Sequence, residues 1–265
     1  MPVNARRLIR KMRGGAQSHL LECDDDRFWV VKFRNNPQHR RVLVNEWVAS
    51  VFLRYLGIAA PDTAFVNLGA DFLAANPDVS LKLGSHRVEV EPGWHFGSAF
   101  PGDPGIVAVY DFLPDVLLEQ VRNAQDFLGV LAFDKWMGNA DARQAIFFRA
   151  ADRSGYVAQM MDHGYVFDGP HWDFPDSPLQ GLYFRPQVYQ RVVSFDDFQP
   201  WLDRVMYFPE GVVDDAIKQI PPEWLDGDED HFDSLLHKLL TRRKRVPDLI
   251  RESSTGRINP FPAWK

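Results

Sequence analysis

The sequence FDKWMGNADARQAIFFRAADRSGYVAQMMDHGYVF, residues 133–167, is the stretch that decides the fold. Its two short apolar runs, Ala145–Phe148 and Tyr156–Met161, are separated by a charged turn, a pattern typical of a β-hairpin. Such a hairpin brings Asp141, just before the first strand, close to Asp162, just after the second. The sequence therefore predicts two carboxylates side by side at one end of a hairpin.

Two neighbouring aspartates with a side-chain amide beside the first are typical of a phosphoryl-transfer site. One aspartate orients a nucleophilic hydroxyl, and the second holds Mg²⁺ on the phosphates together with an amide oxygen. Asn139 and Gln144, on either side of Asp141, are the candidate amides. Two ordinary turn aspartates at the ends of a hairpin explain this stretch equally well, because Asp and Asn are common turn residues.

The composition is that of a soluble globular protein. The 265 residues are 45% hydrophobic and 25% charged, which suffices for one large domain or two lobes with a buried core. The net charge of −6 argues against nucleic acid as a partner. Cys23 is the only cysteine, which excludes an intramolecular disulfide and a cysteine-based zinc site. Because no apolar run approaches the roughly 20 residues that span a bilayer, and no secretory signal is evident, we expect a cytoplasmic protein without membrane contact.

Residues 5–33 have the pattern of antiparallel strands, and two features there suit phosphate binding. Gly14 and Gly15 form a turn whose N–H groups can face phosphate oxygens, although Gly-Gly hairpins are common. Lys32 interrupts the buried strand FWVVKF and therefore needs an anionic partner or a route to solvent. Glu46, near the start of the next predicted helix, either pairs with this lysine or only complements the helix dipole.

The continuous apolar run IVAVYDFL, Ile106–Leu113, predicts a buried strand that leads into helical sequence. Main-chain groups of residues 110–113 are candidates to bind a nucleotide base, and a plain core strand followed by a turn is the alternative. The sequence after Pro114 has mostly helical periodicity. We therefore predict an α+β fold with a β-rich N-terminal lobe, residues 1–113, and a mainly helical C-terminal lobe, residues 114–265.

Taken in order, these motifs resemble the HipA-like kinases, relatives of the protein kinases and phosphatidylinositol kinases. The resemblance implies a two-lobed protein-kinase-like fold. It also implies transfer of phosphate from ATP, with Mg²⁺, to a Ser/Thr hydroxyl or another alcohol of an unknown protein or small-molecule acceptor. The helical remainder resembles a short-form HipA-like kinase domain. The matching stretches, which lie between about residues 10 and 170, are RGGAQSHLL, WVVKF with NEWVASVFLRYLGIAAP, VYDFLPD, DKWMGNADARQAIF and MDHGYVF.

The resemblance assigns roles to individual residues. Asp141 is the expected catalytic aspartate, with Lys32 as the contact to the phosphates and Glu46 as the lysine's partner. Asp162 is the expected metal ligand, with Gln144 as the second. The remaining nucleotide-binding candidates are the phosphate-covering turn Gly14, Gly15, Ala16 and Gln17, and the base-binding residues Tyr110, Phe112 and Leu113.

The chain departs from the family pattern in three respects. Ile146 stands where HipA has a metal-binding Asn, so Gln144 or Asn139 must supply the amide oxygen. Met12 stands where HipA has a regulatory serine, with Ser18 as a possible substitute. The N-terminal subdomain of full-length HipA toxins has no counterpart, so an antitoxin-like partner is not implied. The apolar Ile146 keeps open an ATP-binding pseudokinase acting as a scaffold. A small-molecule or lipid kinase is a further alternative, because a fold does not determine the acceptor.

Overall fold

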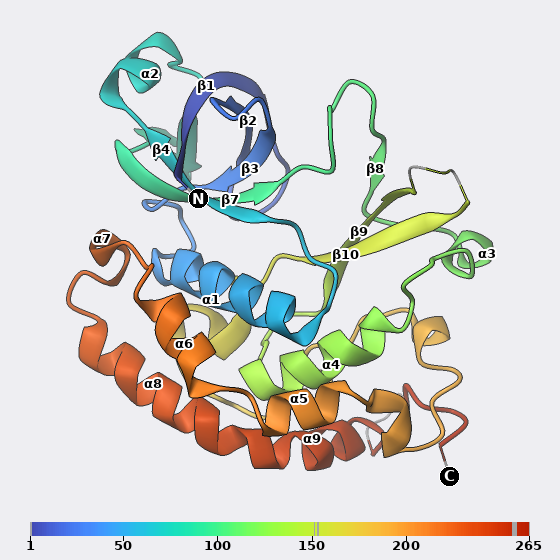
Figure 1. Cartoon of the computed structure of the whole chain (residues 1–265). Coiled ribbons are helices and arrows are strands. Elements are labelled where there is room, and N and C mark those ends of the chain that lie inside the picture. The colour runs from blue at the N-terminus through green and yellow to red at the C-terminus, as the bar shows by residue number, and fades with distance from the viewer. Residues whose placement is uncertain (1, 151, 153, 256–258, 265) are drawn as a thin grey trace.

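The structure is a computed structural model that describes residues 2–150, 152, 154–255 and 259–264. Strands dominate the N-terminal part and helices the C-terminal part, which form two lobes (Figure 1). The predicted α+β fold with two lobes is therefore confirmed, while the boundary at residue 113 stays a prediction.

The N-terminal lobe is built on a closed five-stranded barrel with the strand order β1-β2-β3-β7-β4. Antiparallel pairs follow the chain through the first three strands, and a parallel pairing of β1 with β4 closes the barrel. Alternate residues point inward, and Leu21, Val31 and Val66 are completely buried in the barrel core. The strands are β1 (Pro2–Lys11), β2 (His19–Cys23), β3 (Phe28–Lys32), β4 (Thr63–Leu68) and β7 (Gly93–Ala99).

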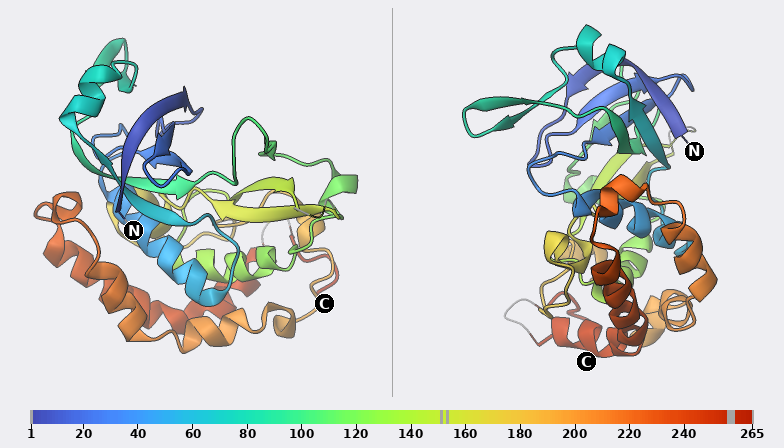
Figure 2. Two further views of the ribbon diagram at one scale, coloured as in Figure 1. Left: turned by 45° about the horizontal axis from the view of Figure 1, so that its top comes forward. Right: turned by 90° about the vertical axis from the view of Figure 1, so that its left-hand side faces the viewer.

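Two smaller elements are inserted between β4 and β7. Helix α2 (Ala70–Ala75) leads to a separate hairpin formed by β5 (Ser80–Leu83) and β6 (His86–Glu89). Leu81 anchors the hairpin in the barrel core, while its tip projects beyond the barrel (Figure 2).

Helix α1 (Arg41–Leu56) lies between the barrel and the C-terminal helices (Figure 1). Because both of its sides are covered, apolar residues occupy nearly its whole circumference, and Trp47, Phe52 and Leu56 join the main hydrophobic core. Gly57, with a φ of 73°, ends the helix by donating its N–H to the carbonyls of the last turn. The helix therefore connects the two lobes through one continuous core.

The C-terminal lobe consists of short helices around α4, whose apolar side chains form the centre of the main core. In the part of the chain that the structure describes, no helix combines the length and hydropathy needed to cross a lipid bilayer. The α-helices of the C-terminal lobe are α3 (Asp115–Leu118), α4 (Asp126–Met137), α5 (Trp201–Met206), α6 (Glu210–Ile217), α7 (Pro222–Leu225), α8 (Glu229–Arg242) and α9 (Val246–Ser253). The 3₁₀ helices are η1 (Val166–His171), η2 (Pro186–Val188), η3 (Phe195–Phe198) and η4 (Arg243–Arg245).

The predicted hairpin is confirmed as β9 (Gln144–Arg149) and β10 (Tyr156–Met161), paired antiparallel from Gln144 opposite Met161 onward. The predicted buried strand Ile106–Leu113 is wrong. Only β8 (Val109–Tyr110) is strand there, at the edge of β9, and Ile106 is 82% exposed. The turns over residues 101–105 hold the start of this run away from the core, so its apolar residues do not form a central strand.

Candidate active site

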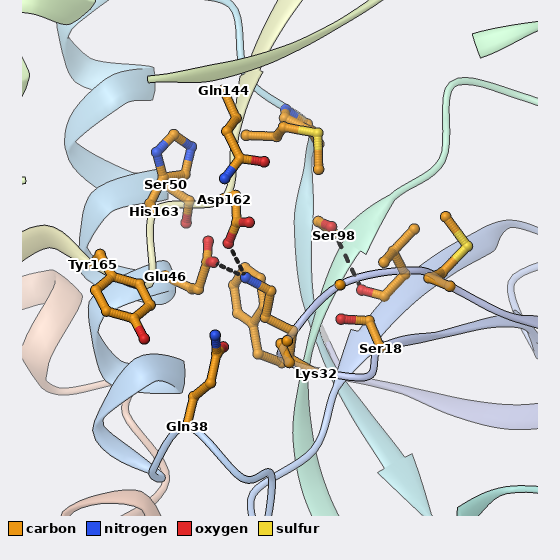
Figure 3. Close-up of a pocket in the computed structure, with 18 of the residues that line it drawn as sticks. Ser18, Lys32, Gln38, Glu46, Ser50, Ser98, Gln144, Asp162, His163 and Tyr165 are labelled. Carbon is orange, nitrogen blue, oxygen red and sulfur yellow. Dashed lines mark hydrogen bonds and ion pairs between the residues drawn. The ribbon is translucent and has the colours of Figure 1, made fainter. Parts of the chain in front are cut away.

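A cavity of about 310 Å³ lies between the lobes and brings together most of the predicted site residues. β3 and the glycine turn line it from the N-terminal lobe, α1 from the side, and the ends of the β9–β10 hairpin from the C-terminal lobe. Figure 3 shows the side chains that converge there. The predicted residues that line it are Gly14, Gly15, Ala16, Gln17, Lys32, Glu46, Asp141, Gln144 and Asp162.

Lys32 is the centre of the polar network in this cavity. Its Nζ donates a hydrogen bond to Glu46 of α1 and another, of 2.5 Å, to Oδ1 of Asp162 (Figure 3). Burial lowers the pKa of Lys32, but the charges of Asp162 and Glu46 outweigh burial and raise this pKa above its ordinary value. The charge of Lys32 in turn holds the pKa of Asp162 below its ordinary value. The ion pair predicted between Lys32 and Glu46 is thus present, and it extends to the second aspartate.

The backbone around Asp162 has an uncommon conformation. Asp162 has a φ of 59°, in the left-handed region that L-residues rarely adopt, and such strain is frequent at functional sites. Two residues later, a Cβ on Gly164 would lie 2.6 Å from a methyl group of Val42. Only glycine therefore lets the Asp-His-Gly segment pass this close to α1.

The turn that carries Asp141 is held by a buried ion pair. Arg143 donates two hydrogen bonds to the carboxylate of Asp134 in α4, at 2.6 and 2.8 Å, and neither side chain is exposed. Asn139 donates to the same carboxylate, and its Oδ1 accepts the backbone N–H of Asp141 at 3.1 Å. The ion pair therefore fixes the backbone from which the exposed Asp141 side chain extends into the cavity.

The same arginine reaches the second aspartate through His163. Nη1 of Arg143 lies 3.0 Å from Nδ1 of His163, whose Nε2 lies 3.1 Å from the carbonyl oxygen of Met160. Because Arg143 can only donate, Nδ1 accepts, and Nε2 carries the proton that is donated to Met160. Burial, followed by the charge of Arg143, lowers the pKa of His163 well below its ordinary value. His163 is a neutral structural bridge between the two aspartate-bearing turns.

Gln144 and Asn139 differ in their availability to a metal ion. Asn139 is fully buried, and both ends of its amide are used within the turn. Gln144 is exposed to the cavity and lies beside Asp162 (Figure 3), because its strand partner Met161 is the residue before that aspartate. Within the described residues, no cluster of three His, Cys, Asp or Glu side chains suits a metal. A carboxylate and an amide oxygen are nevertheless donors that suit Mg²⁺.

The side chain of Gln17 makes its hydrogen bonds within the N-terminal lobe. Its amide donates to the carbonyl oxygen of Lys82 and accepts the backbone N–H of Lys82, each at 2.7 Å. The side chain thus attaches the glycine turn to the edge of β5. Gly14 has a φ of 120°, which explains the need for glycine at this position.

Asn45 is an organising residue that the sequence analysis missed. It is fully buried, and its Nδ2 lies 2.8 to 3.0 Å from the carbonyl oxygens of Gly164, Val166 and Gly169. Its Oδ1 accepts the indole N–H of Trp172. The neighbouring Glu46 contacts Lys32, so consecutive residues of α1 hold both the lysine and the segment after Asp162.

The three predicted base-binding residues are not among those that line the cavity. Tyr110 is 41% exposed and packs edge-on against Tyr156, while Phe112 lies under the guanidinium of Arg185. Leu113 is buried, and its carbonyl oxygen accepts a hydrogen bond from the same arginine. Their assignment to the base stays a prediction, while the apolar run at residues 106–113 does not form the buried strand on which it was based.

The segment that does leave the barrel follows β7. Residues 100–103 line a second cavity, which shares Ala60 and Pro61 with the first. The second cavity thus adjoins the first beside the strand that carries Lys32.

Comparison with known proteins identifies the fold and the family of the chain. Two solved structures share the fold: the Golgi casein kinase with Mn/ADP bound (TM-score 0.55, 14% identity, 96% of this chain and 74% of that chain covered) and the Helicobacter pylori proinflammatory kinase CtkA (TM-score 0.53, 12% identity, 96% and 98% covered). A search of curated proteins found no match. Residues 6–248 match the family described as HipA-like kinase. The chain therefore belongs to the HipA-like kinase family and is a kinase-type phosphotransferase.

Proposed function

We propose that the protein transfers the terminal phosphate of ATP, with Mg²⁺, to a serine or threonine hydroxyl of a protein. The observation that carries this proposal is the contact of Lys32 with both Glu46 and Asp162, in a cavity that Asp141 also lines. A buried lysine with two carboxylate partners and a third carboxylate in reach of solvent suits phosphate binding beside an acceptor hydroxyl. The Mn/ADP complex of the similar Golgi casein kinase supports a nucleotide and a divalent metal as ligands.

The residues have separable roles in this proposal. Lys32 and the N–H groups of the glycine turn bind the phosphates, and Asp141 accepts a hydrogen bond from the acceptor hydroxyl and orients it. Asp162 and Gln144 hold Mg²⁺, which, when bound, neutralises charge on the phosphates. Arg143 and Asn139 keep Asp141 in place without touching substrate.

We propose that the base lies against residues 100–103 rather than against Tyr110, Phe112 and Leu113. The cavity beside this segment adjoins the one that contains Lys32. Gln159 lines it, and in the described part of the chain no group bonds its buried Oε1. An adenine amino group is a suitable donor for this oxygen.

The direct test is transfer of labelled phosphate from ATP by wild type, Asp141→Asn and Asp162→Asn, with casein as acceptor and autophosphorylation followed in the same gel. We expect transfer by wild type and a loss of roughly 10²-fold or more in both variants. Asp215→Asn is the control, because Asp215 is an exposed carboxylate of α6. Equal transfer by all four proteins contradicts the assignment.

The second candidate function is that of an ATP-binding scaffold without transfer, which the apolar Ile146 favours. Nucleotide binding together with no labelled product on any acceptor identifies this case. Formation of ADP only when a small alcohol or a lipid is added identifies a kinase with a different acceptor.

A further inference from the structure

A third cavity, of about 420 Å³, lies on the N-terminal lobe between the end of β1 and the β5–β6 hairpin. The proposed catalytic chemistry makes no use of it. The lining residues that matter here are Lys11, His19, Ser80, Lys82, Ser85 and Arg87.

The cavity is rich in positive charge, although the chain as a whole has a net charge of −6. Lys82 and Arg87 are exposed and directly opposite each other in the hairpin, so their side chains share a face. Like charges in this arrangement repel each other and destabilise a hairpin. Within the described residues neither has an ion-pair partner, and Nζ of Lys11 donates only to the carbonyl and hydroxyl oxygens of Ser80. Asp78 is the one acidic residue among those that line the cavity.

His19 adds a specific requirement. It is buried, and its Nδ1 lies 3.0 Å from the carbonyl oxygen of Gln17, so Nδ1 donates and Nε2 is left as an acceptor. No partner for Nε2 exists among the residues that the structure describes. A ligand that satisfies this cavity therefore offers acceptor oxygens to the cations and one donor to His19.

We propose that this cavity binds a phosphate group, either as free orthophosphate or as a phosphate monoester. Its oxygens accept hydrogen bonds from Lys11, Lys82 and Arg87, which removes the repulsion within the hairpin. In the singly protonated form, the P–OH group donates to His19. Sulfate has the same shape and no proton to donate, so it serves as a discriminating probe in titrations run at about pH 6, where orthophosphate and a phosphate monoester both carry the P–OH proton in a large fraction.

Gln17 connects this site to the cavity between the lobes. Its side chain is bonded to the backbone of Lys82, and both Gln17 and Met12 line the two cavities. A phosphate that holds β5 in place therefore steadies the glycine turn, and by linkage the nucleotide tightens phosphate binding. This coupling rests on the proposed function, whereas the phosphate site itself does not.

The test is an NMR titration of the full chain, without nucleotide, with inorganic phosphate, phosphoserine and sulfate in separate arms. It compares wild type with the Lys82→Glu/Arg87→Glu variant, whose changes are on exposed residues and leave the cores intact. Lys218→Glu/Arg251→Glu is the matched control, since it makes the same change of charge on exposed residues of the C-terminal lobe.

We expect phosphate to shift the amide signals of residues 80–87 and the ring of His19. The affinity of the protein for phosphate should fall at least about tenfold in the Lys82/Arg87 variant and remain unchanged in the control. Equal binding of phosphoserine indicates a monoester site, and phosphate binding alone indicates a free-ion site. Sulfate binding as tight as phosphate overturns the role of His19.

Amide shifts confined to residues 14–17, 32 and 162 overturn the phosphate site itself. An equal loss of phosphate affinity in the control variant also overturns it. ATP is then titrated separately. If the protein binds phosphate but no ATP, the phosphate site is supported and the proposed function is contradicted.

Discussion

Arg143 and Asp134 form a two-hydrogen-bond ion pair in which neither side chain reaches solvent. The pair joins the end of α4 to the turn before β9, and Asn139 and His163 are bonded to its two members. Both aspartate-bearing turns of the site are thus attached to the core of the C-terminal lobe.

Replacing Arg143 by leucine should destabilise the protein strongly, because Asp134 becomes a buried charge without a partner. We expect a loss of about 3–5 kcal/mol in the free energy of unfolding, measured by urea denaturation. Lys218→Leu, which alters an exposed ion pair, should cost less than about 1 kcal/mol. A comparable loss in the free energy of unfolding for the two variants contradicts the structural role given to Arg143.

Replacing Asp162 by asparagine should abolish the effect of Mg²⁺ on nucleotide binding. The carboxylate is the proposed metal ligand, and its contact with Lys32 must adjust when phosphate and metal enter the cavity. Thermal shift with ATP, with and without Mg²⁺, measures this. We expect a Mg²⁺-dependent rise in melting temperature for wild type and none for Asp162→Asn. An undiminished rise in the variant places the metal elsewhere.

Gln144→Ala should raise the Mg²⁺ concentration that gives half-maximal phosphate transfer, because it removes the proposed amide ligand. The fold should be preserved, because Gln144 is exposed and Figure 3 shows no hydrogen bond from its side chain to the residues drawn. Ile146→Ala is the neighbouring control in the same strand. The assay is a Mg²⁺ titration at saturating ATP. An identical Mg²⁺ requirement in wild type and Gln144→Ala excludes Gln144 as a ligand.

Replacing Asn45 by leucine should loosen the segment after Asp162. Carbonyl oxygens of Gly164, Val166 and Gly169 lose their buried donor, and each unsatisfied group costs about 1–3 kcal/mol. Hydrogen exchange should accelerate in residues 164–172 more than elsewhere. Asn76→Leu, at the end of α2, is the control and should leave this segment unchanged. Uniform acceleration across the chain indicates a general loss of stability instead.

The stability of the protein should decline as the pH falls below about 6.5. Burial lowers the pKa of His95 to about 3, and it also lowers the pKa of His163 well below 6.5. The unfolded chain takes up protons at these imidazoles near pH 6.5, whereas the folded chain does so only at lower pH. Their contribution is therefore complete above pH 6.5 and is lost progressively toward the folded pKa values.

Urea denaturation between pH 5 and 7 tests this prediction. His163→Gln should flatten the pH dependence, and the exposed His237→Gln should not. A pH-independent wild type excludes the neutral assignment of the buried histidines.

The fold and much of the candidate site could be predicted because their signals are local. Two apolar runs and a charged turn determine β9 and β10, and the residues at their ends place Asp141 and Asp162 together. The ion pair of Lys32 with Glu46 followed from a lysine in a buried strand and a glutamate in the next helix.

The features that the sequence could not predict depend on residues far away in the chain. Asn45 reaches carbonyl groups 119 to 124 residues later, and no local pattern announces such contacts. The run Ile106–Leu113 failed for a related reason: hydropathy indicates which residues can be buried, but the barrel was already complete without them.

The parallel pairing of β1 with β4 has a consequence for recognition by other chains. The two strands pair only over residues 2–4 and 65–67, so this short seam is closed to an added strand, whereas the edge of β1 beyond Asn4 has no strand partner on the β4 side among the described residues. In the described part of the chain, the β5–β6 hairpin and the three-stranded sheet of β8, β9 and β10 also have open edges. A protein that donates a strand to this kinase therefore pairs with the distal part of β1 or with one of these two small sheets, and not with the β1–β4 seam.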